Sequence, residues 1–264
     1  MLKTALVTGA GSGIGRGFAL ALARRGYHLI LVGRDEPRLQ AVAGEIKLFS
    51  TASVFVADLS DSSARSQLIA SVLAQNGVPT LLVNNAARML AGDYLECSSS
   101  NMEALLSVNL LAPAELTRRF CALDTPPQGV IFILSTAARF PQPYNSLYSA
   151  SKAGLRFLAE SLQVELDGKT RICLAYPPLT ATPMTDRFGS SSWPVYKADG
   201  LKVAERIIAR YEAGHNQITW FDWEALPSLL YRLVPGLFRW VLKSQRHALR
   251  KMFNISKTDQ ARDD

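Results

Sequence analysis

Cysteine and histidine are scarce in this sequence, and neither is spaced for a metal site or a disulfide framework. The 264 residues include only three of each. Cys97, Cys121 and Cys173 are far apart, form no Cys-x-x-Cys pair and are odd in number. Such spacing offers no set of metal ligands, and free thiols are typical of a reducing compartment. We therefore predict no metal ion and no disulfide framework.

Long apolar runs are lacking as well. Nowhere do about 18 consecutive apolar residues predict a transmembrane helix. The apolar run within residues 1–9 reaches glycine too early for a signal peptide. We therefore expect the protein in the cytoplasm.

Acidic residues are fewer than basic ones, 22 against 29, which gives a formal charge of +7. This excess favours anionic partners, such as a phosphorylated cofactor, a membrane surface or nucleic acid. No block of Lys and Arg interleaved with aromatic residues marks a nucleic-acid track. Nucleic acid is therefore not an expected partner.

What the sequence does contain is an alternation of short apolar runs and helical patterns. Strands are predicted at residues 4–7, 28–32, 53–57, 80–83, 130–134 and 171–175. Helices are predicted near residues 14–25, 36–46, 61–75, 99–122 and 149–166. Almost continuously apolar strands are expected when helices cover both faces of a parallel sheet. The alternation predicts right-handed crossovers and an α/β fold with a doubly wound parallel sheet.

The pattern changes after residue 175. Prolines and a Gly-Ser-rich stretch within residues 177–192 predict a mobile segment that could cover a site. A helix near 198–212 and a short strand near 217–220 would complete a single domain, residues 1–225. Residues 226–264 are expected to form a C-terminal extension, with two helical pieces separated at Pro235-Gly236 and a frayed tail.

A glycine-rich turn, residues 8–15, follows the first predicted strand and opens the first predicted helix. Glycine lets the backbone turn tightly and approach a pyrophosphate, and a helix N-terminus offers free N–H groups with a partial positive charge. A glycine turn without a ligand is the alternative, but the order of strand, glycines, helix and second strand is the one that dinucleotide binding requires. The predicted contacts to a dinucleotide come from Gly9, Ser12, Gly13, Ile14 and Gly15.

The second predicted strand ends at Gly33-Arg34-Asp35, where dinucleotide-binding folds contact the adenosine ribose. An acidic side chain there binds the ribose hydroxyl of NAD, whereas Arg accommodates the 2′-phosphate of NADP. Asp35 precedes Glu36-Pro37 and is expected to cap the next helix. Arg34 is then free to pair with a phosphate. We therefore favour NADP(H), with NAD(H) as the alternative.

Tyr148 and Lys152 lie four residues apart near the start of a predicted helix, so they project from one face. A free phenol has a pKa of about 10, which a nearby ammonium and an oxidised nicotinamide would lower. Ser135 ends the strand at 130–134, at the sheet edge where ligands bind, and could hydrogen-bond a substrate oxygen. Alone, a Tyr and a Lys four apart are a common exposed pair. Together with Ser135 and the glycine turn they predict proton transfer coupled to hydride transfer.

With these motifs in place, the chain resembles a short-chain dehydrogenase/reductase over roughly residues 3–220. The resemblance implies a Rossmann fold, a carbonyl or alcohol substrate, and a catalytic set of Asn109, Ser135, Tyr148 and Lys152. It also implies that Asn109 helps to hold a water that relays protons to Lys152. The sequence departs from the family pattern at Ala87 and Pro178, where Gly is usual, and neither change removes a reacting group.

The same resemblance extends the cofactor site. It implies that Asp58 contacts the adenine and that the Asn84-Asn85 pair braces the sheet. The remaining cofactor contacts that it implies are Asn85, Tyr148, Lys152, Pro177 and Thr182. Family members associate through the helices at 99–122 and 149–166, so a homodimer or homotetramer is implied.

The substrate would lie between the segment after Ser135 and the segment after Thr182. These segments supply Phe140, Pro141, Tyr144, Met184, Phe188 and Trp193. An apolar or lipid-like substrate would suit them, although the same side chains could simply pack the cover of the site.

Residues 226–253 combine leucines, Phe238 and Trp240 with six basic residues. Core packing, a subunit contact, a solvated basic face and a helix lying in the plane of a membrane are all open interpretations. For the whole protein, a catalytically silent NADP(H)-binding sensor and a peripheral membrane or interaction protein remain alternatives to an enzyme. Retention of the complete catalytic set favours the enzyme.

Overall fold

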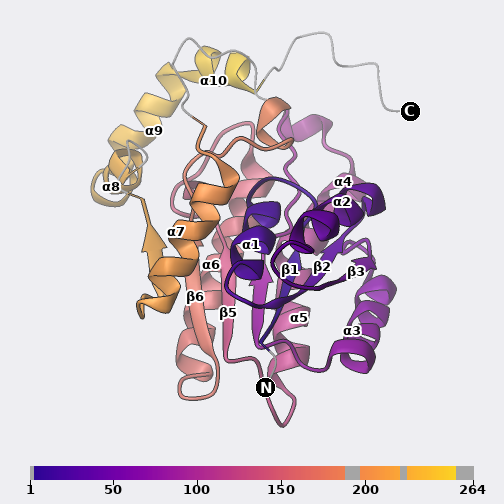
Figure 1. Cartoon of the computed structure of the whole chain (residues 1–264). Coiled ribbons are helices and arrows are strands. Elements are labelled where there is room, and N and C mark those ends of the chain that lie inside the picture. Colours follow the sequence, from indigo (N-terminus) through magenta and orange to yellow (C-terminus); the bar gives the residue numbers. More distant parts are fainter. Residues whose placement is uncertain (1–2, 188–196, 221–224, 254–264) are drawn as a thin grey trace.

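The computed structural model describes residues 3–187, 197–220 and 225–253, and Figure 1 shows their arrangement. Seven strands form one parallel sheet in the order β3-β2-β1-β4-β5-β6-β7. The strands are β1 (Thr4–Thr8), β2 (His28–Gly33), β3 (Ala52–Val56), β4 (Leu81–Asn84), β5 (Gly129–Ile133), β6 (Arg171–Tyr176) and β7 (Gln217–Thr219). The doubly wound parallel sheet is confirmed, and each strand lies within a residue of its predicted bounds.

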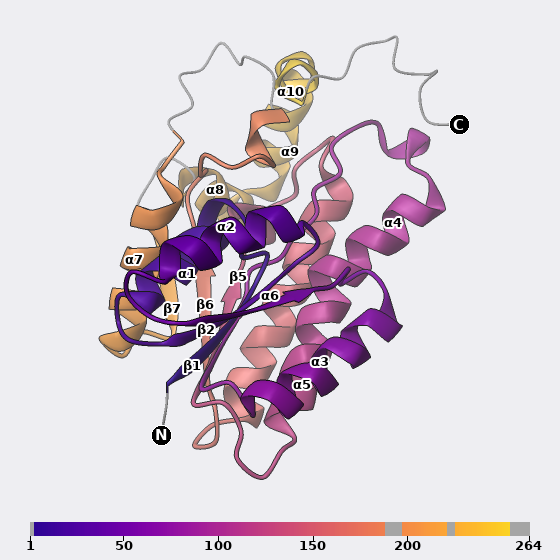
Figure 2. The same ribbon diagram turned by 45° about the vertical axis from the view of Figure 1, so that its right-hand side comes forward.

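Helices cover both faces of the sheet, as Figure 2 shows. One face carries α1 (Gly13–Ala23), α2 (Glu36–Ile46) and α7 (Gly200–Glu212). The other carries α3 (Ser62–Asn76), α4 (Ser99–Leu106), α5 (Ala112–Cys121) and α6 (Ser146–Glu165). Alternate residues of each strand point to opposite faces, so Ala5 and Val7 pack beneath the first group while Leu6 packs beneath the second. This alternation explains why the strands are apolar throughout.

The predicted helix at 99–122 is not continuous. Between α4 and α5 the backbone widens into a π-helical segment, η2 (Ser107–Leu111). Pro113, near the start of α5, has no N–H to donate to the carbonyl of Asn109. The wider turn accommodates this missing bond, and such π-bulges are frequent at functional sites.

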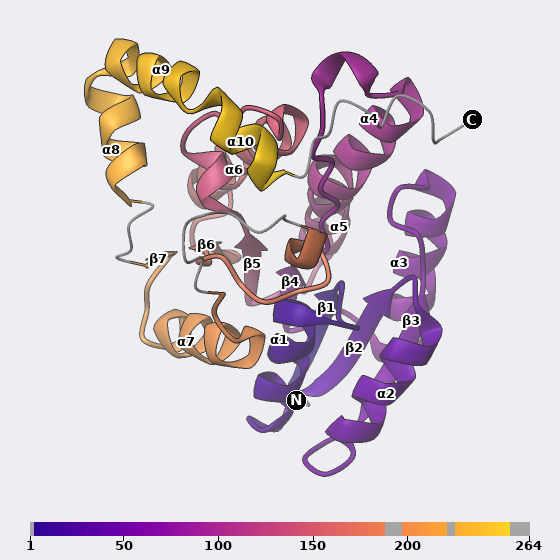
Figure 3. The same cartoon turned by 90° about the horizontal axis from the view of Figure 1, so that it is seen from above.

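The C-terminal extension forms three helices rather than the two pieces predicted. They are α8 (Ala225–Leu233), α9 (Pro235–Ser244) and α10 (Arg246–Met252). Pro235 begins α9, where its missing N–H costs no helical bond. Figures 1 and 3 show α9 and α10 beyond the carboxyl ends of the strands, near the start of α6. No helix among the described residues has the length and apolar character that crossing a membrane requires.

Candidate active site

The carboxyl ends of the parallel strands bring together residues that are far apart in the sequence. The glycine turn follows β1, Asp58 follows β3, Asn85 follows β4, Ser135 follows β5 and Pro177 follows β6. In an open α/β sheet this edge is where ligands bind. The predicted site residues after these strands therefore share one edge of the fold.

The glycine turn leaves little or no room for a side chain at Gly9, Gly13 and Gly15. Gly9 and Gly13 have positive φ angles of 67° and 53°. A Cβ atom on Gly15 would lie 2.0 Å from the carbonyl oxygen of Gly9 and 2.6 Å from Nδ2 of Asn85. The side chain of Ser12 makes no capping hydrogen bond at the start of α1. The turn thus leaves the first amides of α1 available to an anionic ligand, which fits a dinucleotide pyrophosphate.

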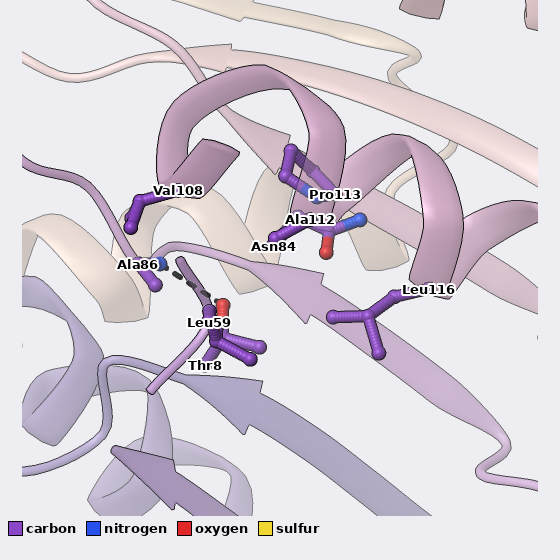
Figure 4. A pocket seen from close by; sticks show the side chains of 8 residues that line it. All are labelled: Thr8, Leu59, Asn84, Ala86, Val108, Ala112, Pro113 and Leu116. Carbon is purple, nitrogen blue, oxygen red and sulfur yellow. Dashed lines mark hydrogen bonds between the residues drawn. The ribbon is translucent and has the colours of Figure 1, made fainter. Parts of the chain in front are cut away.

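Asn85 braces this turn from the neighbouring strand. Its Nδ2 donates to the carbonyl oxygen of Thr8 at 2.8 Å, and its backbone N–H donates to Thr8 Oγ1 at 3.0 Å. Ala86 N–H also donates to Thr8 Oγ1, as the dashed line in Figure 4 shows. Ala87 does not adopt a left-handed backbone conformation. Alanine in place of the usual glycine therefore introduces no strain here.

A small cleft opens beside Thr8 and Asn84 (Figure 4). Its apolar walls include Leu59, Ala86 and Val108. The Oδ1 atom of Asn84 is buried and has no hydrogen-bond partner among the described residues. The cleft has an accessible volume of about 10 Å³, which is room for about one water molecule. It therefore suits ordered water beside Asn84 better than a substrate.

Basic residues lie beside the glycine turn at the end of β2. Arg34 is 67% exposed and forms an ion pair with Asp58, with Nη1 and Oδ2 3.7 Å apart. Asp35 caps α2 as expected, because its Oδ1 accepts from the N–H of Arg38 at 3.0 Å. Arg38 was not predicted as a site residue. Its Cβ would lie 3.2 Å from a Cβ on Gly11, and its guanidinium forms an ion pair with Asp35, with Nε and Oδ2 3.1 Å apart.

The carboxyl group of Asp58 is held in its charged form. Burial opposes its ionisation, but hydrogen bonds from the N–H and hydroxyl of Ser60 and the guanidinium of Arg34 keep its pKa below the ordinary value. An ionised Asp58 can accept hydrogen bonds from a ligand, and it also holds Arg34 near the sheet edge.

Ser135, Tyr148 and Lys152 come together at the ends of β5 and α6. The helix α6 begins at Ser146, three residues earlier than predicted, so Tyr148 lies in its first turn. The hydroxyl of Tyr148 is hydrogen-bonded to Ser135. Lys152 is buried, and its Nζ donates to the carbonyl oxygen of Ile133 at 2.8 Å and lies 5.9 Å from the ring centroid of Tyr148. The three side chains predicted to cooperate are therefore neighbours.

The lowering of the Tyr148 pKa that we expect from Lys152 together with an oxidised nicotinamide stays a prediction, and the chain's own residues shift this pKa upward. Burial raises the pKa of Tyr148, and the hydrogen bond with Ser135 lowers it by less. The Lys152 ammonium donates to the backbone carbonyl oxygen of Ile133 rather than to the phenol. At neutral pH Tyr148 is consequently a neutral O–H donor, which suits protonation of a carbonyl oxygen.

Asn109 lies within the π-helical segment and is fully buried. Its Oδ1 accepts from the N–H of Arg88 at 2.7 Å, and its Nδ2 donates to the carbonyl oxygen of Arg88 and to Oγ of Ser151. Ser151 adjoins Lys152 on α6. The side chain of Asn109 thus links the segment after β4 to the helix that carries Tyr148 and Lys152.

Thr182 reaches back across the sheet edge to the glycine turn. Its Cγ2 would lie 2.6 Å from a Cβ on Gly13. The preceding loop is fixed by the hydroxyl of Thr180, which donates to the carbonyl oxygen of Pro178 at 2.8 Å, and by pairing of Thr180 with Ala198. Proline at position 178 is thus compatible with a loop that brings Thr182 to the glycine turn.

Two of the residues predicted to line the substrate pocket contact the C-terminal extension. The rings of Phe140 and Phe238 lie edge to face, 5.6 Å apart. The hydroxyl of Tyr144 accepts from Nε of Arg246 at 3.1 Å, and Tyr144 has a positive φ of 63°. Met184 is half-buried, while Phe188 and Trp193 lie outside the described residues. The extension therefore packs on the segment after Ser135.

We expect the rate of carbonyl reduction to fall as the pH rises through about 8. Burial lowers the pKa of Lys152 from its ordinary 10.5 to about 8. Above that pH the ammonium becomes a neutral amine, and the positive charge beside Tyr148 is lost. The pH profile of kcat/KM reports this ionisation in the free enzyme. The Lys152→Arg variant retains its charge at this pH, so its residual rate should not fall near pH 8. An unchanged fall near pH 8 in that variant would assign the ionisation to another group.

Comparisons with known proteins agree with this arrangement. A family model described as short chain dehydrogenase matches residues 3–192. A short chain dehydrogenase of Pseudocercospora fijiensis is 33% identical over 182 residues, which is 67% of this chain and 59% of that protein. The chain thus spans less than two thirds of that relative's length.

Two further similarities cover more of both chains. An NADPH-dependent pterin aldehyde reductase of Arabidopsis thaliana is 27% identical over 219 residues, which is 81% of this chain and 90% of that protein. Among solved structures, a short-chain dehydrogenase from Sphingobium yanoikuyae in complex with NADPH has a TM-score of 0.74 at 25% identity and covers 99% of each chain. The latter similarity includes the C-terminal extension.

Proposed function

The chain belongs to the short-chain dehydrogenase family, and from this premise we propose that it is an NADP(H)-dependent oxidoreductase that interconverts a ketone or aldehyde and an alcohol. The observation that carries the proposal is that Ser135, Tyr148 and Lys152 are neighbours at the sheet edge that also holds the glycine turn. Residues 1–225 would bind the cofactor and carry the chemistry, and residues 226–264 would be an accessory extension.

The described residues fit a dinucleotide cofactor. The tight turn at Gly9, Gly13 and Gly15 and the free start of α1 suit the pyrophosphate. Arg34 and Arg38 would pair with the 2′-phosphate. The remaining contacts would come from Ser12, Ile14, Asp58, Asn85, Tyr148, Lys152, Pro177 and Thr182. NADPH, when bound, supplies the hydride that forms the new C–H bond of the alcohol.

The chain's own residues would supply the proton. Ser135 would donate a hydrogen bond to the carbonyl oxygen and hold it beside Tyr148. Tyr148, neutral at pH 7, would give its hydroxyl proton to that oxygen as the carbonyl carbon accepts the hydride. The Lys152 ammonium would stabilise the phenolate that remains, and Asn109 would position α6 through Ser151.

NADPH oxidation with a panel of hydrophobic ketones and aldehydes tests the function. We expect consumption of NADPH that depends on the carbonyl and yields the matching alcohol. Binding of NADPH without oxidation by any member of the panel would favour a silent cofactor-binding protein instead.

Replacing Arg34 by aspartate should weaken NADPH binding about tenfold to a hundredfold and leave NADH binding nearly unchanged, because a charge-assisted contact to the 2′-phosphate is lost. The dissociation constants of both cofactors give the measurement. Arg24→Ala is the matched control. Arg24 is exposed at the C-terminal end of α1, the end opposite the glycine turn, and forms an ion pair with Glu205. Equal weakening of NADPH and NADH would refute the preference for NADP(H).

The subunits would associate through residues 99–122 and 149–166, giving a homodimer or homotetramer. Large apolar side chains are exposed on this surface at Leu111, Phe157 and Val164. Their exposed fractions of 52%, 62% and 79% are high for apolar residues, which supports a contact with another subunit.

A further inference from the structure

The C-terminal extension presents apolar side chains to solvent. Along α8 and α9, Leu229, Leu233, Val234, Leu237 and Trp240 are 45% to 67% exposed. We refer to these five residues as the C-terminal apolar surface. A contiguous exposed apolar patch of this kind marks a contact with another molecule or a membrane.

The same segment carries nearly all of the chain's excess positive charge. Residues 226–253 contain six of the 29 basic residues and none of the 22 acidic ones. The basic residues are Arg232, Arg239, Lys243, Arg246, Arg250 and Lys251. None of the ion pairs found among the described residues involves any of the six. Arg246 and Arg250 are directed to Tyr144, so the charges of the other four are available to an anionic partner.

The apolar and basic side chains share the outward side of α9. Phe238 is 3% exposed and faces the body of the protein, whereas Trp240, two residues on, is 65% exposed. Leu237 and Trp240 are three residues apart and adjoin each other on the helix, and Arg239 and Lys243 form the neighbouring row. All four are exposed. Apolar residues flanked by cations are typical of helices that lie in a membrane interface.

This surface is fixed next to the substrate side of the site. Phe238 packs edge to face on Phe140, and Arg246 donates to the hydroxyl of Tyr144. Arg250 also lies over the Tyr144 ring, 5.7 Å from its centroid. Phe140 and Tyr144 belong to the segment that follows Ser135. A partner bound to α8 and α9 would thus lie close to where the substrate enters.

We propose that the C-terminal apolar surface binds an anionic lipid bilayer and that the enzyme takes an apolar carbonyl substrate dissolved in that bilayer. The substrate half of this proposal rests on the proposed function. A second copy of the chain fits less well, because a symmetric contact would bring two strongly basic segments together. Anionic lipid headgroups instead complement the charge, and the acyl region accommodates Leu237 and Trp240.

Flotation of the full-length protein with vesicles tests the membrane contact. The wild type should float with vesicles of equal parts phosphatidylcholine and phosphatidylglycerol, and much less with phosphatidylcholine alone. The Leu237→Ser/Trp240→Ser and Arg239→Glu/Lys243→Glu variants should each lower the partition into the mixed vesicles by about tenfold or more. Leu48→Ser is the matched control, because Leu48 is 82% exposed at the end of α2, outside the extension. Its partition should equal that of the wild type.

Three results would overturn the proposal. These are a wild type that stays in the buffer, a double variant that floats like the wild type, and a double variant that changes the oligomer mass measured by light scattering. The last result would identify the surface as a subunit interface. Equal melting temperatures of variants and wild type would show that the fold is intact.

A kinetic comparison tests the substrate half. The Leu237→Ser/Trp240→Ser variant should reduce a short, water-soluble ketone at the wild-type rate but lose at least about tenfold with a long-chain ketone held in mixed vesicles. Equal losses with both ketones would contradict the proposal. If the wild type floats but oxidises NADPH with neither ketone, the proposed function fails while the membrane contact stands.

Discussion

Replacing Tyr148 by phenylalanine is expected to lower the NADPH-dependent reduction rate about a thousandfold, within the range of general acid catalysis. The buried phenol is hydrogen-bonded to Ser135, and phenylalanine keeps its ring but not its proton. The affinity for NADPH should change little, because the glycine turn and Arg34 are untouched. Steady-state kinetics and a cofactor titration give the two quantities.

Tyr27→Phe is the matched control for this variant. Tyr27 lies just before β2, at the amino end of the sheet and beneath the Nζ atom of Lys3. Its replacement should leave the reduction rate unchanged. Similar rates for Tyr148→Phe and the parent would show that another group donates the proton.

Replacing Gly15 by alanine is expected to raise the dissociation constant of NADPH by about a hundredfold or more, because the added methyl group displaces the turn that receives the pyrophosphate. The new Cβ would lie 2.0 Å from the carbonyl oxygen of Gly9, a backbone atom that cannot rotate away. The melting temperature should fall as well, since Asn85 braces the same turn. Calorimetric titration and thermal unfolding provide the measurements.

Gly44→Ala separates this effect from a general intolerance of alanine. Gly44 lies within α2, and a Cβ there would meet nothing within 4 Å. Alanine favours the helix by about 1 kcal/mol, so this variant should be as stable as the parent or more so, with unchanged NADPH affinity. Parent-like NADPH binding by Gly15→Ala would mean that the turn does not hold the cofactor.

The sheet and the residues at its edge could be predicted because each depends on a local pattern. Continuous apolar runs mark the buried strands, and two glycines of the turn, Gly9 and Gly13, have the positive φ angles that a tight bend requires. Strand ends then place Asp58, Asn85 and Ser135 at one edge through topology alone. None of these inferences requires knowledge of long-range side-chain contacts.

The features that sequence could not give depend on the tertiary environment. The π-helical segment around Asn109 depends on how α5, which begins beside Pro113, packs between its neighbours. The proline alone indicates that the helix at 99–122 is interrupted, but not how. The raised pKa of Tyr148 depends on how completely its neighbours exclude water. Arg38 belongs to the cofactor region because α2 packs against the glycine turn. The contact of Phe140 with Phe238 joins segments nearly a hundred residues apart.

Deuterium transfer tests the central claim most directly. We predict that NADPH in which both hydrogens on the reactive carbon of the nicotinamide are replaced by deuterium, incubated with the protein and a ketone substrate, yields an alcohol that carries one deuterium on the former carbonyl carbon. Mass spectrometry of the product reads this label. An alcohol formed without deuterium would contradict direct hydride transfer at the site formed by Ser135, Tyr148 and Lys152.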